Sequence, residues 1–128
     1  MSNIPDDLRY TNEHEYVRRS EGGTVEIGIT DYAQGELGDI VFVTLPNVGD
    51  SFEPHQSFGS IEAVKAVSEL FSPIGGEVTA VNTGLDGDPS VVNRDPYGAG
   101  WMIRLKPSNA AEVDALLDAA AYRKHIGE

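Results

Sequence analysis

Lys65 has the surroundings that most favour a chemical role in this sequence. It lies between two strand-like apolar runs, residues 61–64 and 66–71, that no Gly, Pro, Asn or Asp interrupts. A lysine between two such runs is typical of the tip of a β-hairpin, where its ammonium group projects into water. An exposed amine at a tip can accept an acyl group as an amide. Taken alone, the same pattern also describes an ordinary solvated lysine.

Other chemistry finds little support among the side chains. The chain has no cysteine, so a thiol nucleophile and disulfides are excluded. His14, His55 and His125 are far apart in sequence, without the spacing of zinc ligands, and each is expected at the surface. Asp86 and Asp88 lack the spacing of a calcium loop. With no nucleophile-elbow or phosphate-loop motif either, the sequence predicts no catalytic residue and no metal site.

The elements expected to position Lys65 are mainly strands. Besides the hairpin, the hydrophobic pattern predicts strands at residues 24–29, 40–45, 77–82 and 101–105. The run 40–45 is continuously apolar, so we expect that strand to be buried on both faces.

Helices are expected to be short. Asp31 is predicted to cap a helix that Gly38 ends, and Asp118 to cap a helix near the C-terminus. Residues 85–89, which contain an Asp-Gly-Asp sequence, are predicted to form a loop.

Composition limits the class of protein. With 128 residues and 40% hydrophobic content, the chain suits one globular domain. No apolar stretch approaches the roughly 20 residues that span a bilayer, and residues 1–8 have no signal-peptide core. We therefore expect a cytoplasmic protein, or a trimmed mature form, that does not bind membranes.

The net charge of −12 disfavours nucleic acid as a binding partner. It indicates either solubility alone or electrostatic recruitment of enzymes with basic rims.

Residues 58–78 resemble the lipoyl-lysine hairpin of lipoyl carrier domains, and most of the chain resembles the glycine cleavage H-protein family. The matching motifs beyond the hairpin are Tyr10, His14-Glu15, residues 28–34 and 37–43, Val81-Asn82, Val92-Asn93, residues 95–98, Gly100-Trp101 and Lys106-Pro107. Three positions depart from the family pattern. Ala63 stands where Ser is usual, Tyr16 where Trp is commoner, and His55 where Gly is frequent, so the loop at His55 is expected to follow a different path.

The resemblance implies a fold, a cofactor and partners. The fold would be mainly β with short helices, a lipoyl/biotinyl-carrier-like barrel-sandwich hybrid with Lys65 at a hairpin tip. Residues 1–128 would form a single lipoyl-carrier domain, with a hairpin core at about 24–106 and a C-terminal helical segment at about 108–126. Lipoic acid would be attached covalently to Lys65 by a lipoyl ligase or transferase.

The implied function is that of a shuttle in the glycine cleavage system, not of an enzyme. The chain would carry an aminomethyl group from glycine decarboxylase, which uses pyridoxal phosphate, to the tetrahydrofolate-dependent aminomethyltransferase. Dihydrolipoyl dehydrogenase would then reoxidise the lipoyl group. Three alternatives stay open: a relay that donates lipoyl groups to other lipoyl domains, a biotin carrier, and an unmodified interaction domain. Val64 and Ala66 stand where biotin carriers have Met, which disfavours the second.

Three glutamates are candidates for recognition. Glu62 and Glu69 flank Lys65 and would either guide the ligase or a client enzyme or merely solubilise the tip. By the resemblance, Glu15, together with Glu69, would receive the loaded arm in a surface cleft. The alternative for Glu15 is a solvated carboxylate near the N-terminus.

Overall fold

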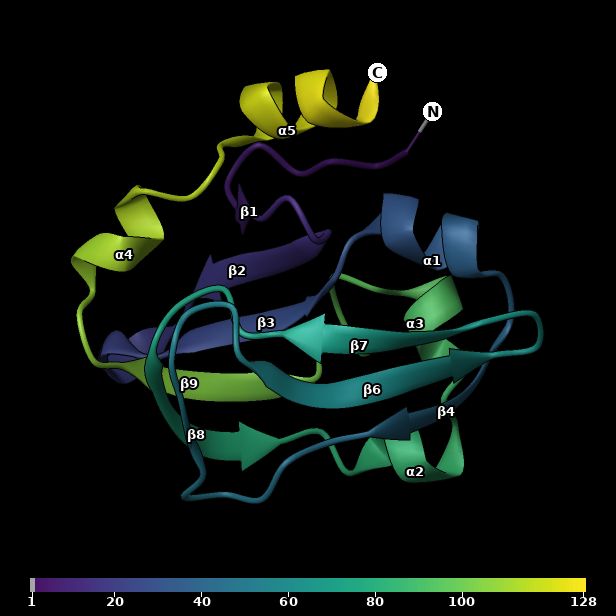
Figure 1. The fold of residues 1–128 in the computed structure, drawn as a ribbon, viewed down its shortest axis with the longest axis horizontal. Helices are drawn as coiled ribbons and strands as arrows, with labels where there is room; N and C mark the ends of the chain where they lie inside the picture. The colour runs from purple at the N-terminus through teal and green to yellow at the C-terminus, as the bar shows by residue number, and fades with distance from the viewer. Residues whose placement is uncertain (1) are drawn as a thin grey trace.

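The computed structural model describes residues 2–128 and contains two antiparallel sheets with short helices around them (Figure 1). The larger sheet has the strand order β1-β2-β3-β9-β8-β5. Its strands are Arg9–Tyr10 (β1), Glu15–Arg19 (β2), Val25–Ile29 (β3), Ser51–Phe52 (β5), Gly76–Val81 (β8) and Ile103–Pro107 (β9). The smaller sheet has the order β4-β6-β7 and consists of Ile40–Thr44 (β4), Ser57–Ala63 (β6) and Val67–Phe71 (β7).

The helices are all short and lie at the ends of the sheets. They are η1 (Glu21–Gly23), α1 (Asp31–Leu37), α2 (Gly84–Gly87), α3 (Val91–Arg94), α4 (Ala111–Asp114) and α5 (Ala119–Ile126). The predicted fold class, mainly β with short helices and a lysine-bearing hairpin, is confirmed. Within residues 2–128, no helix combines the length and the apolar character that crossing a membrane requires.

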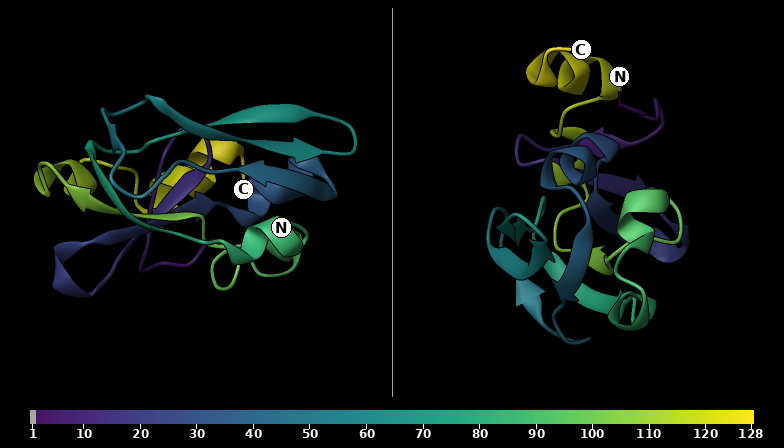
Figure 2. Two further views of the ribbon diagram at one scale, coloured as in Figure 1. Left: turned by 90° about the horizontal axis from the view of Figure 1, so that it is seen from below. Right: turned by 90° about the vertical axis from the view of Figure 1, so that its right-hand side faces the viewer.

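The main core lies between the two sheets. Figure 2 shows the β6–β7 hairpin as a layer separate from the strands of the larger sheet. Ile61 and Leu70 from the hairpin belong to one buried cluster with Ile27, Val78 and Leu105 of the larger sheet. Burying apolar side chains from both layers against each other is the largest favourable contribution to such a fold. It also makes the hairpin a rigid support for its tip.

The prediction that residues 40–45 form a strand buried on both faces is wrong. Ile40 and Val43 are buried, but Val41 is 48% and Phe42 53% exposed. The strand belongs to the smaller sheet, which packs on the core with one face only, and an irregularity in its pairing falls between Ile40 and Phe42. An antiparallel sheet tolerates such a solvent-facing side. Burial in the core therefore does not explain why Val41 and Phe42 are apolar.

Two local predictions also need correction. The cap of α1 is Thr30, whose side chain accepts a hydrogen bond from the Ala33 amide, and not Asp31. Residues 85–89, predicted as a loop, overlap α2, a single helical turn at Gly84–Gly87. Asp-Gly sequences favour tight turns, and one turn of helix uses the same local hydrogen bonds, so the sequence did not separate the two. Gly38 does end α1, with φ 80° and ψ −154°.

A second apolar cluster joins the two ends of the chain. Tyr10 and Tyr122 stack with ring centroids 4.7 Å apart, and Tyr16 and Tyr97 lie in the same cluster. The predicted cap of α5 is confirmed, because the Asp118 carboxylate accepts a hydrogen bond from the Ala121 amide at 2.8 Å. This cluster fixes β1 and the start of β2 beside α5, and β2 contributes to the site described next.

Candidate functional site

Lys65 lies in the turn between β6 and β7, with its side chain exposed to solvent. The amide of Ala63 donates a hydrogen bond to the carbonyl of Ala66 at 2.7 Å and closes the turn. Glu62 and Val67 are the last paired residues before it. The tip is therefore short and its backbone is well defined.

The tip is also tied to the segment between α1 and β4. The amide of Val64 donates to the carbonyl of Asp39 at 3.0 Å. Gly38 lies directly under the lysine stem, because a Cβ atom added at Gly38 would be 3.4 Å from Cε of Lys65. Because this neighbour is a glycine, it places no side chain against the lysine stem.

Asn93 of α3 holds that segment in place. Its side-chain amide donates to the carbonyl of Gly38 at 2.8 Å and to Oε1 of Gln34 at 3.0 Å, and its Oδ1 accepts from the amide of Ile40 at 2.9 Å. All the hydrogen-bonding groups of the Asn93 side chain are thus used around one loop. The sequence alone did not predict this role, because it identifies the Val92-Asn93 pair only as a family motif.

A cleft of about 150 Å³ lies beside the hairpin, between β7, α1 and the start of β2. Its lining residues are Glu13, His14, Glu15, Ile29, Ala33, Glu36, Leu37, Ile61, Ser68, Glu69 and Leu70. The structure thus brings Glu15 and Glu69 to one cleft. Glu62 is not among the lining residues and lies on the exposed face of the smaller sheet instead.

Glu15 is a buried residue of this cleft, only 2% exposed. The hydroxyl of Thr11 donates to its Oε1 at 2.7 Å, and the amide of Phe71 lies 3.4 Å from its Oε2. Burial raises the pKa of the Glu15 carboxyl to about 8, and the hydrogen bonds only partly offset the loss of water. The alternative of a solvated surface carboxylate is therefore wrong, and with this pKa the carboxyl group is mostly neutral at pH 7.

His14 is half-buried beside Glu15, contrary to the expectation of a surface histidine. Its Nδ1 is 2.8 Å from the hydroxyl of Tyr122, which also lies 2.8 Å from Oγ1 of Thr30. Burial, and next to it the neighbouring His125, lower the pKa of His14. With His14 neutral, the other titratable groups among the lining residues are the carboxyl groups of Glu13, Glu15, Glu36 and Glu69, which favours a cationic occupant.

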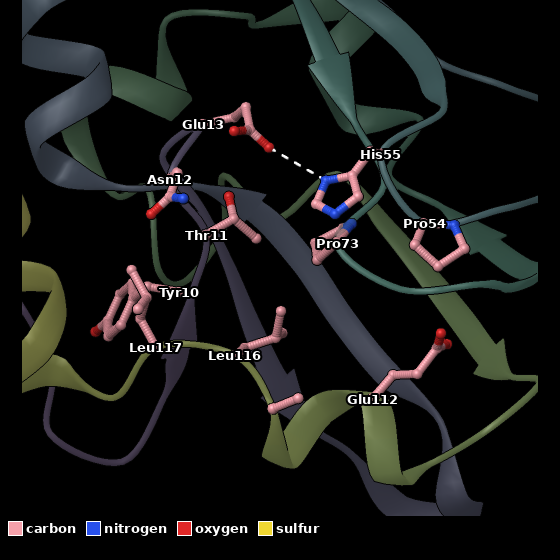
Figure 3. A pocket seen from close by; sticks show the side chains of 11 residues that line it. Tyr10, Thr11, Asn12, Glu13, Pro54, His55, Pro73, Glu112, Leu116 and Leu117 are labelled. Atoms are coloured by element: carbon pink, nitrogen blue, oxygen red, sulfur yellow. Dashed lines mark ion pairs between the residues drawn. The ribbon is translucent and has the colours of Figure 1, made fainter.

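A larger hollow of about 320 Å³ adjoins the cleft at Glu13 (Figure 3). Nδ1 of His55 is 3.4 Å from Oε1 of Glu13 across its rim. His55 has φ 69°, so it adopts the left-handed backbone that glycine would favour, and its amide donates to the carbonyl of Ser72 at 2.7 Å.

Among residues 2–128, no group of three or more potential metal ligands is found.

Two packed antiparallel sheets with an exposed lysine at an anchored hairpin tip are the architecture of carrier domains that bear a cofactor on a lysine. Residues 8–128 match the model of the Glycine cleavage H-protein family. The chain belongs to that family.

Similar proteins cover its whole length. The glycine cleavage system H protein of Mycobacterium avium (strain 104) is 55% identical over 132 residues and covers all of both chains. That of Chlorobium chlorochromatii is 56% identical over 125 residues, 98% of each chain. The crystal structure of a glycine cleavage system H protein from Mycobacterium marinum superposes with a TM-score of 0.89 at 40% identity, covering 98% of this chain and all of that one.

Proposed function

We propose that this chain is the lipoyl-bearing shuttle of the glycine cleavage system, with lipoic acid joined as an amide to Lys65. It takes an aminomethyl group from glycine decarboxylase to the tetrahydrofolate-dependent aminomethyltransferase, and dihydrolipoyl dehydrogenase reoxidises it. The observation that carries the proposal is the exposed amine of Lys65 at an anchored hairpin tip in a member of this family.

The residues around Lys65 fit an attached acyl group. No ion pair or hydrogen bond of the Lys65 ammonium occurs within residues 2–128, and Gly38 leaves space beside its stem. When bound, the lipoyl group supplies a disulfide that is reduced and reoxidised. The chain itself holds the attachment point in place and presents it to partners, so we assign it no catalytic residue. The cytoplasm is its expected compartment.

In this proposal Glu15 is the receptor for a cationic cargo. An ammonium group entering the cleft would meet the carboxyl groups of Glu13, Glu15, Glu36 and Glu69. A cation beside Glu15 lowers the pKa of its carboxyl from about 8, so the proton leaves to solvent as the charge pair forms. A charge-assisted hydrogen bond of this kind contributes about 1.5–3 kcal/mol. An uncharged arm gains no such bond and stays outside the cleft.

The modification can be tested by the mass of the intact protein from its native host. We expect the mass of one lipoyl group on the wild type. Lys65→Arg keeps the positive charge but not the primary amine; it should fold like the wild type, carry no lipoyl group and support no glycine cleavage. Lys124→Arg, a change at an exposed lysine of α5, is the matched control and should be modified normally. Lipoyl mass that persists in Lys65→Arg would refute the assignment.

A further inference from the structure

The stem of Lys65 lies against the backbone of Gly38, although the side chain as a whole is exposed. A Cβ atom added at Gly38 would be 3.4 Å from Cε, 3.9 Å from Cδ and 4.0 Å from Nζ of Lys65. Figure 1 shows the end of α1 and the β6–β7 turn at the same end of the molecule. The lysine stem therefore leaves the hairpin tip on the side where α1 ends.

On that side lies the cleft that contains Glu15. Residues 36–37, which immediately precede Gly38, line the cleft from α1, and residues 68–69 line it from β7. Lys65 is only three positions before the second pair. The residues under the lysine stem and the nearest residues of the cleft are thus neighbours along both segments of the chain.

The backbone of Gly38 differs from that of an ordinary helix end. Gly127, which ends α5, has φ 80° and ψ 25°, the left-handed conformation common at such ends. Gly38 has the same φ but ψ −154°, in a region essentially restricted to glycine, and its carbonyl accepts a hydrogen bond from Nδ2 of Asn93 at 2.8 Å. Ending the helix does not require this conformation. Backbone outliers of this kind cluster at functional sites.

We propose that Gly38 is a positioning residue for the lipoyl arm. Its bare backbone, held by Asn93, forms a platform under the stem of Lys65 that directs the arm from the hairpin tip into the cleft containing Glu15. A side chain larger than a methyl group at position 38 would occupy the space of the stem and turn the arm away from the cleft. The inference deepens the proposed function and rests on it, because it takes Lys65 as the attachment site and Glu15 as the receptor for the cargo.

The position of the stem can be measured before any lipoyl group is attached. In the unmodified protein, NMR should show a nuclear Overhauser effect between Hα of Gly38 and Hε of Lys65. Asn93→Asp keeps the size of the side chain but loses the amide that donates to Gly38 and Gln34, so this signal should weaken.

Asn82→Asp is the matched control. Asn82 is half-buried like Asn93, donates to two backbone carbonyls and accepts from one backbone amide, but it does so in a different loop, with partners Ala99, Trp101 and Gly84. The signal between Gly38 and Lys65 should therefore be the same in Asn82→Asp as in the wild type.

The second measurement follows the loaded arm. Formaldehyde and ammonia condense with one thiol of the reduced, lipoylated protein, which forms an aminomethyl thioether and releases water; the reverse reaction is then timed by the ammonia that appears. Gly38→Leu should release ammonia about tenfold faster than the wild type, because its arm loses the charge-assisted hydrogen bond in the cleft. Gly38→Ala has the same backbone strain, but its Cβ fits in ordinary contact with the stem, so its rate should stay within about twofold of the wild type.

Two further readouts separate positioning from a general structural effect. Asn93→Asp should release ammonia faster than Asn82→Asp, which also decides the matter if circular dichroism shows that Gly38→Leu is unfolded. Dihydrolipoyl dehydrogenase should show an unchanged KM for every folded variant, because the uncharged arm does not use the cleft. A KM that rises together with the rate of ammonia release would contradict a role in positioning.

The outcomes distinguish this inference from the proposed function. Suppose that the wild type releases ammonia more slowly than Glu15→Gln. Equal rates for Gly38→Leu and Gly38→Ala, or for Asn93→Asp and Asn82→Asp, would then overturn the platform alone. A wild type that releases ammonia as fast as Glu15→Gln, or that carries no lipoyl group on Lys65, would overturn the proposed function and the platform with it.

Discussion

Glu15 shows how folding changes the chemistry of a single residue. Its carboxyl group has lost nearly all contact with water and has a pKa of about 8, above the ordinary value of 4.5. Between these two values the folded protein holds a proton on Glu15 that the unfolded chain has released. Stability from this group therefore falls as pH rises through that window, and the whole penalty is present above about pH 8.

Glu15→Gln should remove this penalty, since an amide does not ionise. The stability of the variant relative to the wild type should therefore be greater at pH 9 than at pH 5, by on the order of 2–4 kcal/mol. Urea denaturation of both proteins at the two pH values measures the difference. Glu62→Gln, at an exposed position, controls for the loss of one negative charge. A Glu15→Gln difference that is the same at both pH values would show that Glu15 is ionised in the folded protein.

Sequence and structure differ in what they reveal about individual residues. Lys65 could be found from the sequence because the pattern on both sides of it is local. The burial of Glu15 could not, because β7, whose Phe71 amide lies beside its carboxyl group, is more than fifty positions later in the chain. The role of Asn93 was missed for the same reason: its partners lie more than fifty positions earlier in the chain.

At the scale of elements, the link between α1 and β4 supports the hairpin tip. Gly38 there has φ 80° and ψ −154°, a region that essentially only glycine occupies. The local sequence sufficed to place the end of α1 at this glycine. It did not suffice for β4, where the same apolar letters fit a strand buried on one face or on two.

Gly38→Ala should destabilise the protein by about 1–3 kcal/mol because alanine must adopt that backbone conformation. The strain would fall next to Asp39, whose carbonyl accepts the hydrogen bond from the Val64 amide, so this amide should exchange with solvent faster. Thermal denaturation and hydrogen exchange measure the two effects.

Gly35→Ala is the informative comparison within the same helix. Gly35 is exposed inside α1 with nothing near the position of an added Cβ, so this change should stabilise the protein by up to about 1 kcal/mol. Effects of the same sign at both glycines would contradict the special role given to the Gly38 backbone.

At the scale of the whole molecule, the net charge of −12 is the dominant feature. Exposed charges act over about 8 Å at physiological ionic strength and over longer distances in dilute salt. If this charge steers the protein to its enzymes, raising salt should increase the KM for the lipoylated protein more than it lowers kcat. Assays of dihydrolipoyl dehydrogenase at low and high salt test this expectation. Free lipoamide, an uncharged substrate of the same enzyme, is the control, and its KM should hardly change. A KM for the protein that is constant with salt would argue against steering.

The exposed apolar side chains of the smaller sheet, Phe42 and Val67, have a consequence for the protein in concentrated solution. Both β4 and β7 are edge strands of a three-stranded sheet, and unpaired strand edges next to apolar side chains can join to another copy of the same chain. Mutual repulsion between highly acidic molecules keeps such edges apart at neutral pH. Acidification neutralises the carboxylates while leaving Phe42 and Val67 unchanged. We therefore expect the protein to self-associate once most of its negative charge is lost.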